Sequence, residues 1–142
     1  MRAKKVSPVM VEIIRNAFIS IAEEMNASML RSAYSPLIYE SKDCSVGIFD
    51  KHARLLGQAA GLPIFLGNLV TCIEILTDKV GLENYKPGDV YMMNDSYLQG
   101  THLTDITVIA PIFYKEELIG FSASRADGGH IGGKDLGPSS DS

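Results

Sequence analysis

The sequence has few cysteines, no long apolar run and no basic cluster, and each shortage excludes a class of protein. Cys44 and Cys72 form no C-x-x-C motif, so we expect two free thiols in a reducing cytoplasm. Charged residues interrupt every apolar stretch well before the ~20 residues that a membrane helix needs, so no membrane span is expected. With 13 basic against 17 acidic residues and no Lys/Arg cluster, no nucleic-acid partner is expected either.

A nucleotide-binding motif is also missing. The stretch "DGGHIGGKDLG" is rich in glycine, but Lys134 precedes Asp135 and no G-K-[ST] follows, so we expect no ATP site in this chain. Its glycines permit close backbone approach and expose N–H groups, which suits an anionic ligand or a substrate. An irregular surface loop fits the same composition equally well.

The length is that of one domain: 142 residues, 46% of them hydrophobic, are enough for a real core. The last residues read "IGGKDLGPSSDS" and directly follow the segment richest in glycine and potential ligands. We therefore expect residues 1–142 to be a single domain and the N-terminal part of a longer protein, although a native disordered tail would look the same.

The pattern of apolar residues predicts an α+β fold. Ser7 and Pro8 mark a helix start, an apolar repeat every four residues carries the helix to about Ser32, and Pro36 prevents its continuation. Residues 44–58 are typical of a hairpin, and a second apolar stripe predicts a helix ended by Gly81. Strands follow at about 90–94, 106–113 and 118–124. We expect a long N-terminal helix and β-hairpins that form a mixed or antiparallel sheet, with the second helix packed on it.

The last two strands are joined by the short polar turn "YKEE", and their pairing brings distant polar residues together. If the turn centres near residues 115–116, Asp105 faces residues 126–127, and His102 lies beside residues 129–130. His102, Asp105, Asp127 and His130 then converge at the open end of one hairpin. Imidazole and carboxylate are ligands that Zn, Mn and Fe accept. Residues three apart on a strand point to opposite faces, so a shared site requires "THLT" to be a bent loop.

Two interpretations without any ligand compete with a metal site. The four residues fit solvated loop positions, and an ionic network with Arg125 also fits them. Convergence argues against the first, because unpaired carboxylates at the ends of apolar strands cost several kcal/mol each. A cation at the centre relieves that cost, and Arg125 relieves part of it.

Two long segments resemble a known family. "NDSYLQGTHLTDITVIAPIF", followed by "LIGFSASRADGGHIGG", is similar to the hydantoinase B family of ATP-dependent hydantoinases and 5-oxoprolinases, which is related to acetone and acetophenone carboxylases. The family pattern reads N-D-P-Y-x-G-G-T-H-L-P-D-I. The segment "AYSPLIYESKDCSVGIFDKHARLLGQAAGLPIFLGNL" resembles the family's opening region. The resemblance covers nearly the whole chain.

The resemblance implies a divalent metal, Mn, Zn or Fe, held by residues of this chain. His102 and Asp105 follow from the T-H-L-x-D-I match, and these two are also the predicted catalytic residues. Asp43 follows from the match around "KDCSVGIFD". Many members read R-A-H-H-x-D where this chain reads "RADGGHIGG"; we expect His130 as the fourth ligand, with Asp127 as the alternative. Arg125 is expected either to hold a substrate carboxylate or phosphate or to pair with Asp127.

The resemblance also implies a division of labour. ATP is bound by a separate, hydantoinase A-type subunit, which phosphorylates the substrate, and this chain supplies the metal to a hetero-oligomer in the cytoplasm. Opening of a cyclic amide is the leading function, and carboxylation of a ketone by the same metal is the runner-up. A non-catalytic interaction domain, whose polar strand ends bind only protein, is the third hypothesis. Without its partner subunit, the chain is expected to have no catalytic activity and to bind no ATP.

Overall fold

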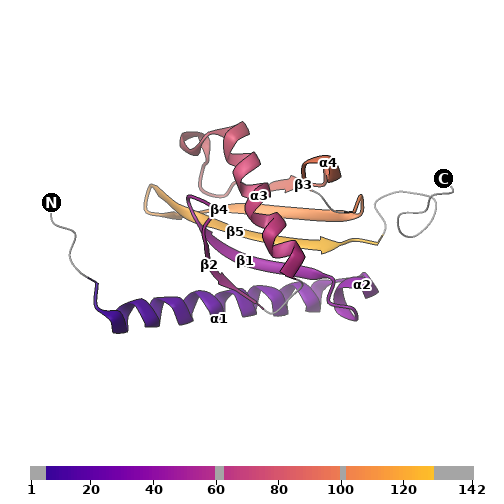
Figure 1. The fold of residues 1–142 in the computed structure, drawn as a ribbon, viewed down its shortest axis with the longest axis horizontal. Coiled ribbons are helices and arrows are strands. Elements are labelled where there is room, and N and C mark those ends of the chain that lie inside the picture. The colour runs from indigo at the N-terminus through magenta and orange to yellow at the C-terminus, as the bar shows by residue number, and fades with distance from the viewer. Residues whose placement is uncertain (1–5, 60–62, 100–101, 130–142) are drawn as a thin grey trace.

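A computed structural model describes residues 6–59, 63–99 and 102–129 of the chain, and the predicted ligand His130 lies outside these ranges. The described strands form one sheet, with helices on both of its faces (Figure 1). Their bounds are α1 (Pro8–Ser32), α2 (Pro36–Tyr39), β1 (Cys44–Asp50), β2 (Leu55–Gln58), α3 (Pro63–Val80), the 3-10 turn η1 (Leu82–Asn84), β3 (Tyr91–Met93), α4 (Ser96–Gln99), β4 (Asp105–Tyr114) and β5 (Glu117–Asp127).

The sheet has five strands in the order β2-β1-β5-β4-β3, and each neighbouring pair is antiparallel. The predicted α+β class is therefore confirmed. The hairpin register also agrees with the prediction, because Asp105 is paired with Asp127. A register shift between Ile112 and Phe113 displaces the pairs nearest the turn by one residue.

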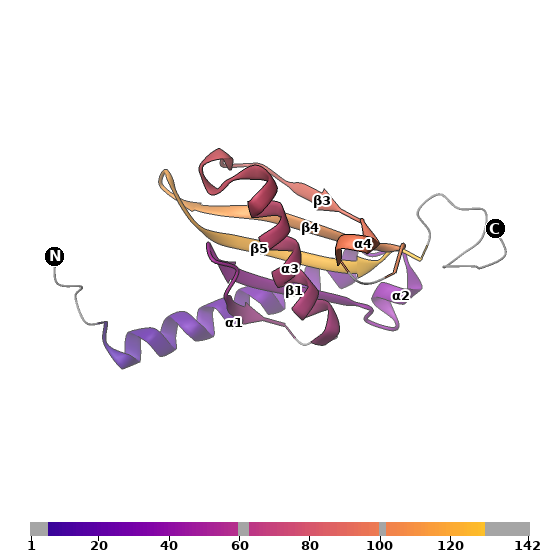
Figure 2. The same ribbon diagram turned by 45° about the horizontal axis from the view of Figure 1, so that its top comes forward.

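The two long helices cover opposite faces of this sheet. In β1, Val46 packs with Ala22 of α1, whereas Phe49, three residues on, packs with α3 residues including Leu69. Residues an odd number apart on a strand point to opposite faces, so the strand alternation separates the helices. Figure 2 shows α3 in front of the sheet and α1 behind it.

The main core lies between α3 and the sheet. The predicted stripe of α3 is buried at Leu69, Cys72, Ile73 and Leu76. It meets an aromatic and aliphatic layer from three strands: Phe49, Ile109, Phe121 and Ala123. α3 is thereby fixed over β1, β5 and β4, and its Cys72 faces the polar end of the same layer.

The apolar stripe of α1 contacts the sheet from about Phe18 onward, and its first turns are exposed. Met25 and Met29 lie against Val46, but Val9 is 68% exposed and Ile13 is 57% exposed. Within the described part of the chain, no helix is long and apolar enough to cross a membrane. The predicted free thiols are confirmed, since both cysteines are buried and form no disulfide.

Candidate metal centre

Strand pairing brings three aspartates to one edge of the sheet. Asp105 begins β4 and is paired with Asp127 at the end of β5. Cys44, the first residue of β1, is paired with Ala126, and the Asp127 N–H donates to the carbonyl of Asp43 at 3.1 Å. The first hairpin therefore lies beside the second, with Asp43 at the same end as Asp105 and Asp127.

The loop before β4 bends so that His102 joins this edge. The His102 N–H donates to Asp105 Oδ2 at 3.0 Å, and the Asp105 N–H donates to the His102 carbonyl at 3.3 Å. Because of this turn, His102 Nδ1 lies 3.7 Å from Asp105 Oδ2. The bend that a shared site requires is therefore present over residues 102–104.

His102, Asp105 and Asp127 form a cluster of possible ligands. One nitrogen or oxygen from each lies within 4.8 Å of the others. Two ligands that share an ion at ~2.1 Å each stand at most ~4.2 Å apart, so a small side-chain movement would close the cluster on a cation. Asp105 is fully buried and Asp127 is 7% exposed, whereas the His102 side chain is 60% exposed. The cluster thus has a buried acidic floor and an open imidazole side.

Two buried oxygens test whether the cluster suits a cation. Among the described residues, Asp105 Oδ1 and Asp43 Oδ1 are buried and have no hydrogen-bond partner. A buried carboxylate oxygen without a donor or a cation is costly. Carboxylate oxygens and one imidazole are ligands that Mn, Fe and Zn accept. The residues present therefore fit a divalent ion.

Asp43 lies within electrostatic reach of the whole cluster. Burial raises the pKa of Asp43, and the negative charges of Asp127 and then Asp105 raise that pKa further, while His102 lowers it. The negative charges of Asp127 and Asp105 therefore disfavour ionisation of Asp43, in addition to its burial. Asp43 as a ligand stays a prediction.

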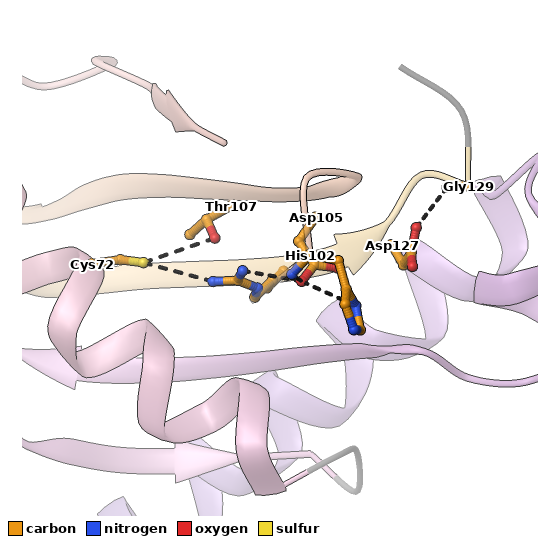
Figure 3. Close-up of polar contacts among 7 residues, drawn as sticks. Cys72, His102, Asp105, Thr107, Asp127 and Gly129 are labelled. Carbon is orange, nitrogen blue, oxygen red and sulfur yellow. Dashed lines mark hydrogen bonds and ion pairs between the residues drawn. The ribbon is translucent and has the colours of Figure 1, made fainter. Parts of the chain in front are cut away.

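Arg125 is the buried cation beside the cluster. It is 1% exposed, and its Nη2 donates to Asp105 Oδ2 at 3.2 Å. Its Nη1 donates to Cys72 Sγ at 3.9 Å, and the Cys72 thiol donates to Thr107 Oγ1 at 3.9 Å (Figure 3). Burial raises the pKa of the Cys72 thiol, which favours its neutral form at neutral pH. A substrate-binding role for Arg125 stays a prediction.

Sequence reasoning ranked Asp127 below His130, and it missed the contacts of Cys72 and Thr107. The signal for Asp127 was present, because the hairpin register pairs it with Asp105. No local signal marks Cys72, since only the placement of α3 over the sheet brings its thiol to Arg125.

The fold is an antiparallel sheet covered by helices, and the site is a cluster of one imidazole and carboxylates where the strands end. Comparison with known proteins gives the family. The chain belongs to the Hydantoinase B/oxoprolinase family, whose profile matches residues 7–142. It is 37% identical to the 5-oxoprolinase of Saccharomyces cerevisiae over 129 residues, which are 90% of this chain and 10% of the yeast protein. It is 32% identical to the B component of a putative D-/L-hydantoinase from a Pseudomonas species, over 87% of this chain and 21% of that protein.

Two solved structures share the architecture. The ATP-dependent caprolactamase of Pseudomonas jessenii superposes with a TM-score of 0.72 at 25% identity, over 87% of this chain and 21% of that one. An acetone carboxylase superposes with a TM-score of 0.77 at 20% identity, over 85% of this chain and 16% of that one. The second likeness shows a common fold. The chain spans about a tenth to a fifth of the length of these proteins.

Proposed function

We propose that this chain forms the metal-holding part of an enzyme that opens cyclic amides with the help of ATP. The observation that carries the proposal is the cluster of His102, Asp105 and Asp127 at the open edge of the sheet. The family supports the reaction class, because relatives at 33–37% identity bear the name 5-oxoprolinase and a solved relative at 25% identity bears the name caprolactamase. 5-Oxoproline and caprolactam are both cyclic amides.

Three residues of this chain would hold a divalent ion, Mn, Zn or Fe. Asp105 and Asp127 supply oxygens from the buried floor, His102 supplies a nitrogen from the exposed side, and Asp43 is the candidate for a fourth place. When bound, such an ion lowers the pKa of a coordinated water and polarises a carbonyl. The exposed imidazole of His102 leaves that side of the cluster accessible to a small substrate.

The nucleotide is assigned to a partner. The sequence has no G-K-[ST] phosphate loop, and one relative is named as the B component of a hydantoinase, which implies at least one further component. We propose a hetero-oligomer in which ATP is held by a hydantoinase A-type subunit, which activates the amide before it is opened. Carboxylation of a ketone is the runner-up, and the likeness to acetone carboxylase supports it through the fold alone.

Two measurements test the proposal. Elemental analysis and calorimetry should find one divalent ion per chain in the native protein and much less in His102→Ala, with exposed Asp78→Ala on α3 as the control. ATP hydrolysis coupled to ring opening should then be assayed with the A-type partner on 5-oxoproline, caprolactam, hydantoins, and ketones with bicarbonate. Turnover of ketones alone would move the assignment to the carboxylases, and a native protein that binds no divalent ion would refute the metal site.

A further inference from the structure

We infer that Arg125 limits Asp105 to one oxygen toward the ion, and that the site thereby selects ions of the size of Mn²⁺ over Ca²⁺. This inference rests on the proposed metal site and assigns Arg125 a positioning role in ion choice. The protein itself already holds one of the two carboxylate oxygens of Asp105.

The contacts of the Asp105 carboxylate with the described residues converge on Oδ2. Arg125 Nη2 donates to this oxygen at 3.2 Å, the His102 N–H donates to it at 3.0 Å, and His102 Nδ1 lies 3.7 Å away. Oδ1 is buried and accepts no hydrogen bond from the described residues. We take Oδ1, which has no protein donor, as the oxygen that an ion would bind, because two donors already hold Oδ2.

The guanidinium that holds Oδ2 is itself fixed. Arg125 lies in the central strand β5, paired with Thr107 of β4 and with Ser45 of β1, and its side chain is fully buried under α3. Its Nη1 donates to Cys72 Sγ on that helix (Figure 3). Packing on both sides prevents the fork from turning away, so an arriving ion meets Asp105 in one orientation.

Asp127 is restricted in the same manner. Its Oδ1 accepts a hydrogen bond of 2.7 Å from the Gly129 N–H, in a turn where Gly129 has φ +65°. Both buried carboxylates of the cluster therefore have one oxygen occupied by a protein donor. From these three residues an ion meets two single oxygens and one imidazole nitrogen, and Asp43 is the candidate for one further carboxylate.

This set disfavours Ca²⁺. Calcium takes about 6–8 oxygen ligands at roughly 2.3–2.6 Å and commonly binds a carboxylate through both oxygens. Smaller divalent transition ions accept imidazole and fewer ligands. Removing the guanidinium takes away the charged donor of Asp105 Oδ2 and leaves the His102 N–H as its one donor among the described residues. Bidentate binding of Asp105 then becomes easier, which is an advantage to Ca²⁺ above all.

The test is a ratio of affinities. Dissociation constants for Mn²⁺ and Ca²⁺ should be measured by calorimetry on the native protein and on Arg125→Met. Loss of one positive charge strengthens the binding of both divalent ions alike, so that effect cancels in the ratio. We expect the preference for Mn²⁺ over Ca²⁺ to fall by about tenfold, the lower range for partners that orient metal ligands. Arg54→Met, which removes an exposed guanidinium in the first hairpin, should leave the ratio unchanged.

Two further readouts keep the inference testable if Arg125→Met does not fold. Arg125→Lys retains the charge without the planar fork, and it should lower the ratio by a smaller factor. In the unmodified protein with ¹³C-labelled aspartate, infrared carboxylate stretches in Mn²⁺ should show the wide splitting of one-oxygen binding.

An unchanged ratio in the folded variant, or the narrow splitting of bidentate binding, overturns the role of Arg125 and leaves the metal site standing. A native protein that binds neither ion overturns the proposed function itself.

Discussion

At the scale of single residues, burial separates the two members of the His102–Asp105 pair. The solvated loop position considered for both residues fits the exposed side chain of His102, but it is wrong for Asp105, which is fully buried. His102→Ala should lower the free energy of unfolding by about 0.5 kcal/mol or less, since its side chain is 60% exposed, while metal occupancy is lost. Urea unfolding in a chelator and elemental analysis check both parts. Full occupancy in the variant would remove His102 from the site.

Asp105→Ala should behave differently, because it leaves the buried guanidinium of Arg125 without its carboxylate. Removing one partner of a buried ion pair costs about 3–5 kcal/mol. Asp105→Asn keeps an oxygen that can accept from Arg125 and from the His102 N–H, so its cost should be clearly smaller. Equal costs for the two variants, measured by urea unfolding without metal, would show that the ion pair contributes little.

Asp50 offers a pH-dependent prediction in the turn of the first hairpin. Burial alone would raise the pKa of Asp50, but hydrogen bonds from Arg54 and from the His52 N–H outweigh it and hold the pKa below the usual 3.8. A lowered folded pKa stabilises the protein above pH 3.8, and that contribution disappears as the pH falls through the folded pKa.

Asp50→Ala should therefore cost about 1–3 kcal/mol at neutral pH, and the difference from the native protein should shrink on acidification below pH 3.8. Chemical unfolding as a function of pH measures this difference. Asp50→Asn serves as the control, since it keeps an acceptor but cannot titrate. A difference for Asp50→Ala that stays constant from neutral pH down to acid contradicts the mechanism.

At the scale of elements, the contact of α1 with the sheet depends on a glycine. A Cβ on Gly57 of β2 would lie 2.7 Å from the backbone carbonyl of Phe18, so Gly57→Ala must push α1 away. We expect a loss of about 1–3 kcal/mol. Gly67→Ala in α3 is the matched control, because its Cβ meets nothing within 4 Å and helix propensity predicts a gain of about 0.5–1 kcal/mol. Thermal unfolding of the two variants measures both changes in stability. A Gly57→Ala variant as stable as the native protein would mean that α1 packs loosely on the sheet.

Local chemistry explains which elements were predictable. Pro8 starts α1 and Gly81 ends α3, as expected, because prolines and glycines act through their own backbone angles. Ser7 is the N-cap residue, but its side chain makes no capping hydrogen bond. β5 runs three residues past its predicted end, since β1 continues to pair with it as far as Ala126. The short helices α2 and α4 were not predicted, because four residues carry too little periodicity to be recognised.

At the scale of the whole molecule, the site was predictable as far as one hairpin determined it. Pairing across a short turn is a local matter, and it placed Asp105 against Asp127. The order of strands is set by tertiary packing, so the insertion of β5 between β1 and β4, and the position of Arg125 under Cys72, could not be read from any local pattern. The ranking of His130 above Asp127 came from family resemblance and stays untested.

We expect the stability of the whole domain to depend on metal, because acidic side chains gather at the proposed ion site. Burial and the negative charges of Asp127 and Asp105 raise the pKa of Asp43, so a charged Asp43 is unfavourable without an ion, and the ion pair of Arg125 with Asp105 offsets part of the negative charge. Asp43→Asn should therefore unfold at a higher temperature than the native protein in a chelator. In saturating Mn²⁺ the order should reverse, because an ion that binds only the folded state stabilises it by RT ln(1 + [L]/Kd), and the variant has lost a ligand. Thermal unfolding of both proteins in the two buffers measures this reversal of their order of stability.

Asp78→Asn, on the exposed face of α3, should show no such reversal. A native protein that is more stable than Asp43→Asn in both buffers would show that Asp43 supports the fold in some way other than as part of the ion site.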